Sequence, residues 1–200
     1  IPYERVSKEE GFNTLEVHFD VSEVLTTLPV VSVGGEAFNC GALEAPPPYA
    51  CFFTVTEEHL ALEGDQLINI QLTDPLGNQS YTSSNITLDF TPPALETSSF
   101  SPNTITLLNP SSTLTLIATE ALQESAQELV WEALSPPSMM ITSPNIFTWK
   151  YTLSDTSNIV DNGTYTLDTV KLTDLVGNTD VIDLGAPFPV ELRIDKVAPQ

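Results

Sequence analysis

Apolar and polar residues alternate one by one in several short segments of this chain. Apolar side chains take every second position in residues 15–21 (LEVHFDV) and again in residues 68–73 (INIQLT). A period of two places one face of a β-strand in a core and the other face in solvent. Gly, Pro and Asn residues separate such segments at short intervals. The pattern predicts an all-β chain of short strands, which is typical of a β-sandwich.

The same pattern occurs twice along the chain. Residues 72–78 read LTDPLGN and residues 172–178 read LTDLVGN, and five of these seven positions are identical. Each of these two motifs is preceded by an early alternating strand with a glutamate after it. Each is followed by a last strand that ends in Asp and Pro. Pro92 and Pro93 cannot donate ladder hydrogen bonds, so the last strand of the first repeat must stop there. We therefore expect two modules, residues 1–93 and 94–200.

Two segments of the second copy are harder to assign. Residues 120–133 (EALQESAQELVWEA) are rich in helix formers, but residues 129–131 also suit a strand in the position of residues 29–33. Both interpretations stay open. An insertion around Asp180 to Pro189 is expected to delay the last strand of this copy.

A strand ending in Asp-x-x-Gly-Asn, followed by a last strand ending in Asp-x-x-x-Pro, resembles the bacterial immunoglobulin-like repeats of large surface adhesins and secreted repeat proteins. The matching residues are Asp74, Gly77, Asn78, Asp89 and Pro93 in the first copy and Asp174, Gly177, Asn178, Asp195 and Pro199 in the second. Glu23 and Glu120 match a further position at the end of the second strand. The resemblance implies two tandem immunoglobulin-like β-sandwiches that act as non-catalytic stalk or adhesion modules, often made rigid by calcium.

The charge balance limits the kinds of partner. The 200 residues include 6 Lys and Arg against 27 Asp and Glu, which gives a net charge of −21. Such a chain repels the phosphates of nucleic acid and of anionic membranes. It also suits hard cations such as Ca²⁺, which prefer carboxylate oxygens. No apolar run is long enough for a transmembrane helix, so we expect no membrane insertion. We interpret the chain as a piece of a longer protein located outside the bacterial cell or on its surface.

The two cysteines, Cys40 and Cys51, flank a proline-rich loop between two expected strands. A disulfide closing this short loop would stabilise the first module by about 2–4 kcal/mol. It would also indicate an oxidising compartment. Two free buried thiols are the alternative interpretation.

Four residues form the candidate metal site. In an immunoglobulin-like sandwich the second strand and the penultimate strand end at the same pole, which places Glu120, Asp174 and Asn178 together. Asp89 stands at the exit of the first module. We expect these residues to bind Ca²⁺ between the modules, with Glu23 and Asp74 serving a preceding module and Asp195 a following one. A tight turn alone also explains the Asp-x-x-Gly-Asn pattern, because Asp, Pro and Gly suit its positions.

No catalytic site can be assembled from the sequence. His18 alternates out of a strand and His59 follows two glutamates in an expected loop, with no nucleophile motif near either. Trp131, Trp149 and Tyr151 could form a sugar-stacking platform, but aromatic residues on strands more often belong to a core. We therefore expect a structural spacer that contacts neighbouring repeats of its own chain and a protein or glycan at a host or cell surface. The alternatives are a ligand-binding module that uses loops such as residues 34–51, and an accessory module of a secreted hydrolase.

Overall fold

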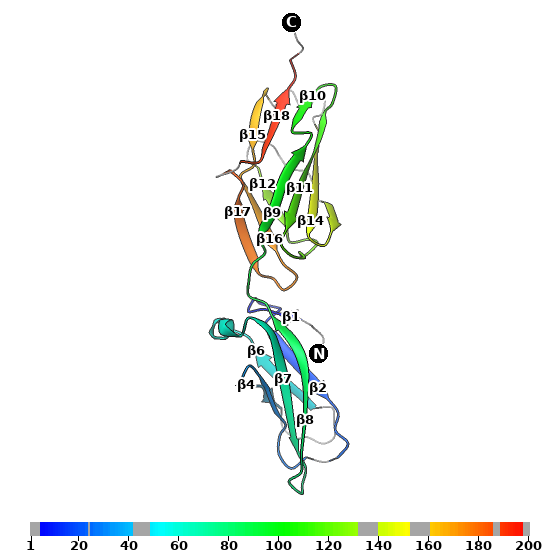
Figure 1. Ribbon diagram of the computed structural model, residues 1–200, viewed down its shortest axis with the longest axis vertical. Helices are drawn as coiled ribbons and strands as arrows, with labels where there is room; N and C mark the ends of the chain where they lie inside the picture. The colour runs from blue at the N-terminus through cyan, green and yellow to red at the C-terminus, as the bar shows by residue number, and fades with distance from the viewer. Residues whose placement is uncertain are drawn as a thin grey trace. The chain divides into compact units, whose positions relative to one another are not determined.

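The computed structural model of the chain describes residues 5–23, 25–41, 49–131, 140–152, 161–185 and 189–197. The chain divides into two compact units, Ile1–Thr91 and Pro92–Gln200, two residues before the boundary expected from the sequence. Figure 1 labels most of the strands of both units. Each unit has a hydrophobic core of its own.

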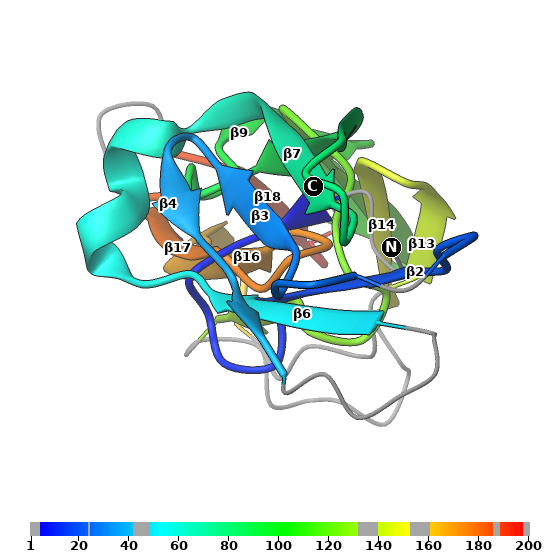
Figure 2. The same ribbon diagram turned by 90° about the horizontal axis from the view of Figure 1, so that it is seen from below.

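The first unit consists of short strands and one 3₁₀ helix. Its elements are β1 (Arg5–Val6), β2 (Thr14–Phe19), β3 (Val30–Val33), β4 (Glu36–Ala37), β5 (Asn39–Cys40), β6 (Tyr49–Thr54), η1 (Glu57–Leu62), β7 (Gly64–Thr73) and β8 (Gln79–Leu88). One sheet has the order β1-β8-β7-β3-β4 and the other β2-β6-β5. Figure 2 shows β3, β4 and β7 in one layer, with β2 and β6 in the facing layer. The short parallel pairing of β1 with β8 completes the first sheet.

The core of the first unit lies between these two sheets. Alternate residues of β2, β3, β6 and the middle of β7 point into it, as the period of two predicts. Leu15 of β2, Ile68 of β7 and Leu88 of β8 are each 0% exposed. Removing such side chains from water is the main favourable term in the stability of the unit.

The second unit repeats this plan. Its strands are β9 (Leu95–Ser101), β10 (Thr104–Thr106), β11 (Ser111–Ala118), β12 (Glu128–Val130), β13 (Met140–Ser143), β14 (Ile146–Thr152), β15 (Gly163–Thr166), β16 (Thr169–Thr173), β17 (Thr179–Asp183) and β18 (Glu191–Asp195). One sheet has the order β13-β14-β11-β9, and the facing strands pair as β12-β16-β17 and β10-β18-β15. The β10–β18 pair is parallel, as β1–β8 is in the first unit. Each unit is an immunoglobulin-like β-sandwich, which confirms the predicted fold class.

Both uncertain segments of the second unit are settled by strand pairing. Residues 128–130 form β12, which pairs with β16 as β3 pairs with β7, so the strand interpretation is confirmed. The expected delay of the last strand is confirmed, because the strand is interrupted between Asp183 and Glu191. β17 follows the turn at once and pairs with β16 over its whole length. The strand stops after Asp183 and resumes as β18, and the Val190 N–H donates to the Leu184 carbonyl at 3.0 Å across the interruption.

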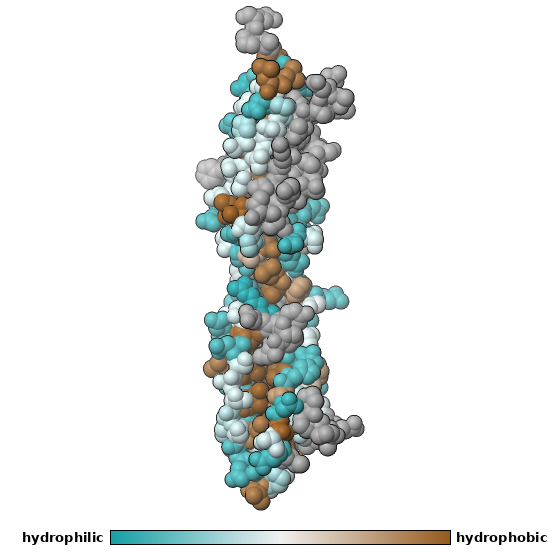
Figure 3. Space-filling model, turned by 90° about the vertical axis from the view of Figure 1, so that its right-hand side faces the viewer, coloured by the Kyte–Doolittle hydropathy of each residue, from teal (hydrophilic) through white to brown (hydrophobic). Residues whose placement is uncertain are grey.

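Polar residues cover most outward strand positions. On the surface drawn in Figure 3, the apolar areas (brown) are bordered by hydrophilic ones (teal). Within the described ranges, no helix has the length and apolar character needed to cross a membrane.

Candidate metal centre

The Asp-x-x-Gly-Asn segments form the same turn in both units. In the first unit the Asp74 carboxylate Oδ1 accepts hydrogen bonds from the backbone N–H groups of Leu76 (2.8 Å) and Asn78 (2.7 Å), while Oδ2 accepts one from the Asn78 amide (2.7 Å). The Gly77 N–H donates to the Asp74 carbonyl at 3.1 Å. Gly77 has φ of 85°, a conformation that residues with a Cβ rarely adopt.

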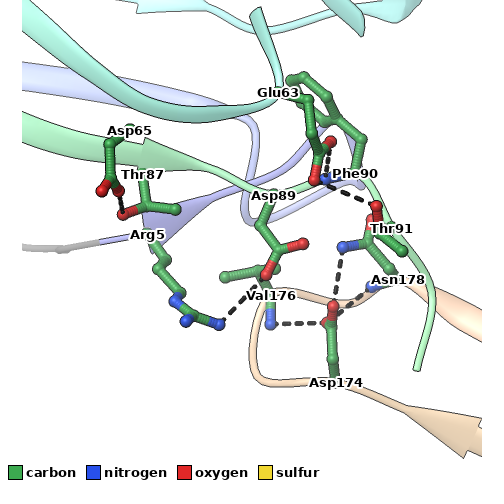
Figure 4. Close-up of polar contacts among 10 residues, drawn as sticks. All are labelled: Arg5, Glu63, Asp65, Thr87, Asp89, Phe90, Thr91, Asp174, Val176 and Asn178. Atoms are coloured by element: carbon green, nitrogen blue, oxygen red, sulfur yellow. Dashed lines mark hydrogen bonds and ion pairs between the residues drawn. The ribbon is translucent and has the colours of Figure 1, made fainter. Parts of the chain in front are cut away.

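The second unit reproduces this hydrogen-bond network. Asp174 Oδ1 accepts from the Val176 and Asn178 N–H groups at 2.9 Å each, and Oδ2 accepts from the Asn178 side-chain amide at 2.7 Å (Figure 4). Gly177 has φ of 88°. The turn interpretation of the motif is therefore confirmed in both copies.

The same network limits what each aspartate can offer to a cation. A carboxylate oxygen has two lone pairs, and Oδ1 of Asp174 uses both for N–H donors. Oδ2 uses one for the Asn178 amide. The oxygen through which Asp174 can bind a metal is therefore Oδ2, in a monodentate manner. Asn178 would contribute its amide oxygen, because its amide nitrogen already donates to Asp174.

Glu120 lies beside Asp174 in the second unit. Leu122 forms an isolated antiparallel bridge with Asp174, which fixes the chain just after Glu120 against the start of the turn. Ligand oxygens of Glu120 and Asp174 lie within 4.8 Å of each other. Two oxygens on one Ca²⁺ are at most about 5 Å apart, given Ca–O distances of about 2.3–2.6 Å. The spacing of the pair is compatible with coordination of one cation by both carboxylates.

Gln127 braces this end of the second unit. Its side chain donates to the Thr173 carbonyl (2.9 Å) and accepts from the Thr173 N–H (2.9 Å), in the manner of a strand pair. The Gln123 N–H also donates to the Thr173 carbonyl, at 3.0 Å. The segment that follows Glu120 is therefore held by hydrogen bonds although it forms no regular strand there.

The first unit has a matching arrangement around Glu23. Leu25 is buried, and Thr26 donates from its backbone to the Thr73 carbonyl, as Gln123 does to Thr173. Glu23 and Asp74 line a hollow of about 420 Å³ together with Asp20. The hydrogen bond from the Asn78 side chain is the main reason why the pKa of Asp74 lies below its ordinary value.

Asp89, the fourth predicted ligand, ends β8 in the first unit. Its Oδ2 forms an ion pair with Nη1 of Arg5 at 3.2 Å (Figure 4). The neighbouring residues are also fixed, because the Glu63 carboxylate accepts from the Phe90 N–H (2.8 Å) and the Thr91 hydroxyl (3.1 Å). Arg5 therefore already neutralises part of the charge of Asp89. A joint role of Asp89 with Glu120, Asp174 and Asn178 stays a prediction, and so do the roles of Glu23, Asp74 and Asp195 at further junctions.

Sequence reasoning did not find Arg5. It lies 84 positions before Asp89 and reaches it through the parallel β1–β8 pairing, which matches Arg5 with Thr87. An arginine in a strongly acidic chain indicates an ion pair with some carboxylate. Only the strand pairing shows that this carboxylate is Asp89. Gln127 was missed for a similar reason, since its partner Thr173 belongs to a distant strand.

The predicted disulfide between Cys40 and Cys51 is present. It joins the adjacent strands β5 and β6, in which the two residues are direct partners. Cys51 is 0% exposed and belongs to the core of the first unit.

The histidines and Trp131 have structural environments. His18 contacts Glu16 on the outer side of β2 at 2.5 Å. His59 lies in η1 rather than in the loop expected from the sequence, where its Nδ1 accepts from the Thr56 N–H at 3.0 Å. Trp131 is 3% exposed and packs against Phe100, which places it in the core. The side chains of Trp149 and Tyr151, the other members of the conceivable sugar platform, lie outside the described part.

Comparisons with known proteins give the fold but no family. No family model matches the sequence, and no curated protein matches it. Similar solved structures include a Ca²⁺-stabilised adhesin with which an Antarctic bacterium binds ice (15% identity, 98% of this chain, 47% of that chain, TM-score 0.47). Others are a 1.5-MDa bacterial ice-binding adhesin (15%, 98% and 62%, TM-score 0.43) and titin domains I67–I69 (11%, 97% and 62%, TM-score 0.36). The chain spans less than two thirds of each of these structures, and at such low similarity they establish no shared function.

Proposed function

We propose that this chain is a pair of non-catalytic structural and adhesion modules from a large secreted or cell-surface bacterial protein. The observation that carries the proposal is the repetition of one immunoglobulin-like unit, with the same Asp-x-x-Gly-Asn turn and the same glutamate before a buried leucine. Tandem copies of one fold suit a role in spacing and presentation, because each copy adds length without new chemistry.

The disulfide and the acidic surface support a location outside the cell. A bridge between Cys40 and Cys51 persists in an oxidising compartment and is rare in a reducing one. A net charge of −21 keeps such modules soluble and apart from nucleic acid.

Calcium is the proposed ligand of the second unit. Glu120 and Asp174 supply closely spaced carboxylates, and Asn178 supplies an amide oxygen on the same turn. A bound cation would offset the repulsion between the two carboxylates and hold this end of the unit in one conformation. The sequence also predicts Asp89 as a ligand. In that case the junction between the units should be stiffer with bound metal than without it.

Calcium titration of the intact chain tests this proposal. Ca²⁺ should raise the melting temperature of the second unit, with stabilisation of about 2.7 kcal/mol at a hundredfold excess over the dissociation constant. Glu120→Gln should remove most of this response, because it takes away one charged ligand. Glu23→Gln is the matched control, since it changes the corresponding glutamate of the first unit and should leave the response of the second intact.

The contribution of Asp89 needs a separate measurement. Small-angle scattering in Ca²⁺ and then in EDTA reports whether the chain changes its dimensions, and Asp89→Asn should abolish most of that change while both units stay folded. Unchanged melting and unchanged scattering in the parent chain would rule out calcium as a structural ligand. A melting response that survives in Asp89→Asn but not in Glu120→Gln would confine the site to the second unit.

A further inference from the structure

The outward face of the β3, β7 and β8 strands in the first unit carries an uncharged set of side chains. Strand register arranges six of them in two rows, Val30–Gln71–Tyr81 and Ser32–Asn69–Ser83. We refer to these six residues as the amide–tyrosine face. Their inward neighbours on β3 and β7, such as Val31 and Ile70, are core residues, so this face is turned to solvent.

The second unit shows what the same positions look like without this pattern. Its corresponding rows, set by the same register, are Glu128–Lys171–Val181 and Val130–Thr169–Asp183. Three of these six positions are charged and none is aromatic. The scaffold and the turn are therefore shared, whereas the chemistry of this face differs between the units. None of the six residues of the amide–tyrosine face is charged, in a chain with a net charge of −21.

Tyr81 is both exposed and held in place. Tyr81 is 68% exposed to solvent. Its hydroxyl nevertheless accepts a hydrogen bond from Gln71 Nε2 (3.2 Å) and donates one to Gln79 Oε1 (2.5 Å). A ring fixed in this way loses little conformational freedom when a ligand binds, which reduces the cost of association. A shallow hollow of about 230 Å³ lies beside it, bordered by Val30, Asn69 and Gln71.

These features select the chemistry of a ligand. Asn and Gln amides each present donors and an acceptor, which pair with hydroxyl groups. An exposed aromatic ring offers an apolar surface to the C–H face of a sugar ring, and its hydroxyl offers a polar end. An uncharged face does not attract basic partners. The acidic parts of the surface would bind such partners instead. Acidic partners would be repelled by those parts.

We propose that the amide–tyrosine face binds a neutral oligosaccharide, with the ring of Tyr81 against one sugar and the amides of Asn69 and Gln71 bonded to its hydroxyl groups. This function goes beyond the spacer role and does not depend on calcium. It makes the first unit a ligand-binding module, while the second unit lacks the equivalent surface.

The test uses the 200-residue chain and a panel of cello-, xylo-, manno- and malto-hexaose, with binding measured by calorimetry and by amide chemical-shift changes. At least one hexaose should bind and shift amides of β3, β7 and β8. Tyr81→Val, which installs the second unit's residue, should weaken binding by about tenfold or more, the usual effect of truncating an aromatic anchor. Phe52→Val is the matched control, because Phe52 is 43% exposed on the opposite sheet. It should leave binding unchanged.

Several outcomes would overturn the inference. Absence of binding by every hexaose at millimolar concentration would do so, as would binding that Tyr81→Val leaves intact. Gln71→Lys also introduces the residue of the second unit. It should weaken binding without lowering the melting temperature, which would show that binding is lost because the surface changes and not because the unit unfolds. Self-association in sedimentation experiments that Tyr81→Val abolishes would assign the face to a second copy of the chain instead. Loss of the calcium response would have no bearing on any of these results.

Discussion

Reduction of the Cys40–Cys51 disulfide should destabilise the first unit and leave the second unchanged. The bridge has a sequence separation of 11 and joins two neighbouring strands. Closing a loop of that length removes about 9 cal/mol/K of entropy from the unfolded chain, or about 3 kcal/mol at room temperature. For a unit of this size, such a loss corresponds to a fall in melting temperature of about 10–20 °C.

Reduction isolates this effect better than substitution does. Cys51 is fully buried, so Cys51→Ala would also leave a cavity in the core. Reduction keeps both sulfur atoms and breaks only the covalent link. The sequence contains two cysteines, and both belong to the first unit, so the second unit serves as an internal reference in the same sample.

Differential scanning calorimetry with and without a phosphine reductant is the appropriate assay, with mass spectrometry to verify that reduction is complete. We expect two transitions, of which only the first moves. A Cys40→Ala/Cys51→Ala variant should be insensitive to the reductant. Complete reduction with no shift of the first transition would refute the loop-entropy argument, and equal shifts of both transitions would refute the independence of the two units.

Two further predictions concern charged groups of the first unit. The pKa of Asp74 lies below its ordinary value of 3.8, chiefly because the Asn78 amide donates to its carboxylate. Its stabilising contribution is therefore present above the unfolded pKa and is lost as pH falls through the lower folded pKa, so the first unit should weaken below about pH 4. Urea melts across this range should show a smaller loss in Asp74→Asn, and identical profiles would contradict the assignment. Arg5→Gln removes the ion pair with Asp89, and because Arg5 is half exposed the cost should be only about 0.2–1 kcal/mol. If Asp89 is a calcium ligand, the variant should bind Ca²⁺ more tightly in calorimetry, and an unchanged affinity would argue against that role.

Local features of this protein were predictable from its sequence. The period of two placed Ile68 and Ile70 in the core, because alternation along a strand follows from backbone geometry alone. The Asp-x-x-Gly-Asn turn was predictable because its hydrogen bonds join residues within five positions of each other. The disulfide was predictable because the chain holds only two cysteines and the intervening segment is short.

Strand partners could not be derived in this way, because alternation specifies which side of a strand is apolar and not which strand lies beside it. The pairing of β12 with β16 decided between helix and strand for residues 128–130. The insertion around Asp180 to Pro189 could be predicted from the sequence, but its exact bounds, from Asp183 to Glu191, follow from the strand pairing.

Contacts across the sheets were likewise decided by tertiary structure. Arg5 reaches Asp89 only because β1 runs parallel to β8, and no local pattern encodes that approach. Tyr81 and Gln71 come into contact through the register of β7 and β8, and Val30 joins their row from β3. The sequence by itself determined the fold class, the turns and the covalent link. Tertiary structure decided which polar side chains share a face, since that depends on pairings between residues far apart in the chain.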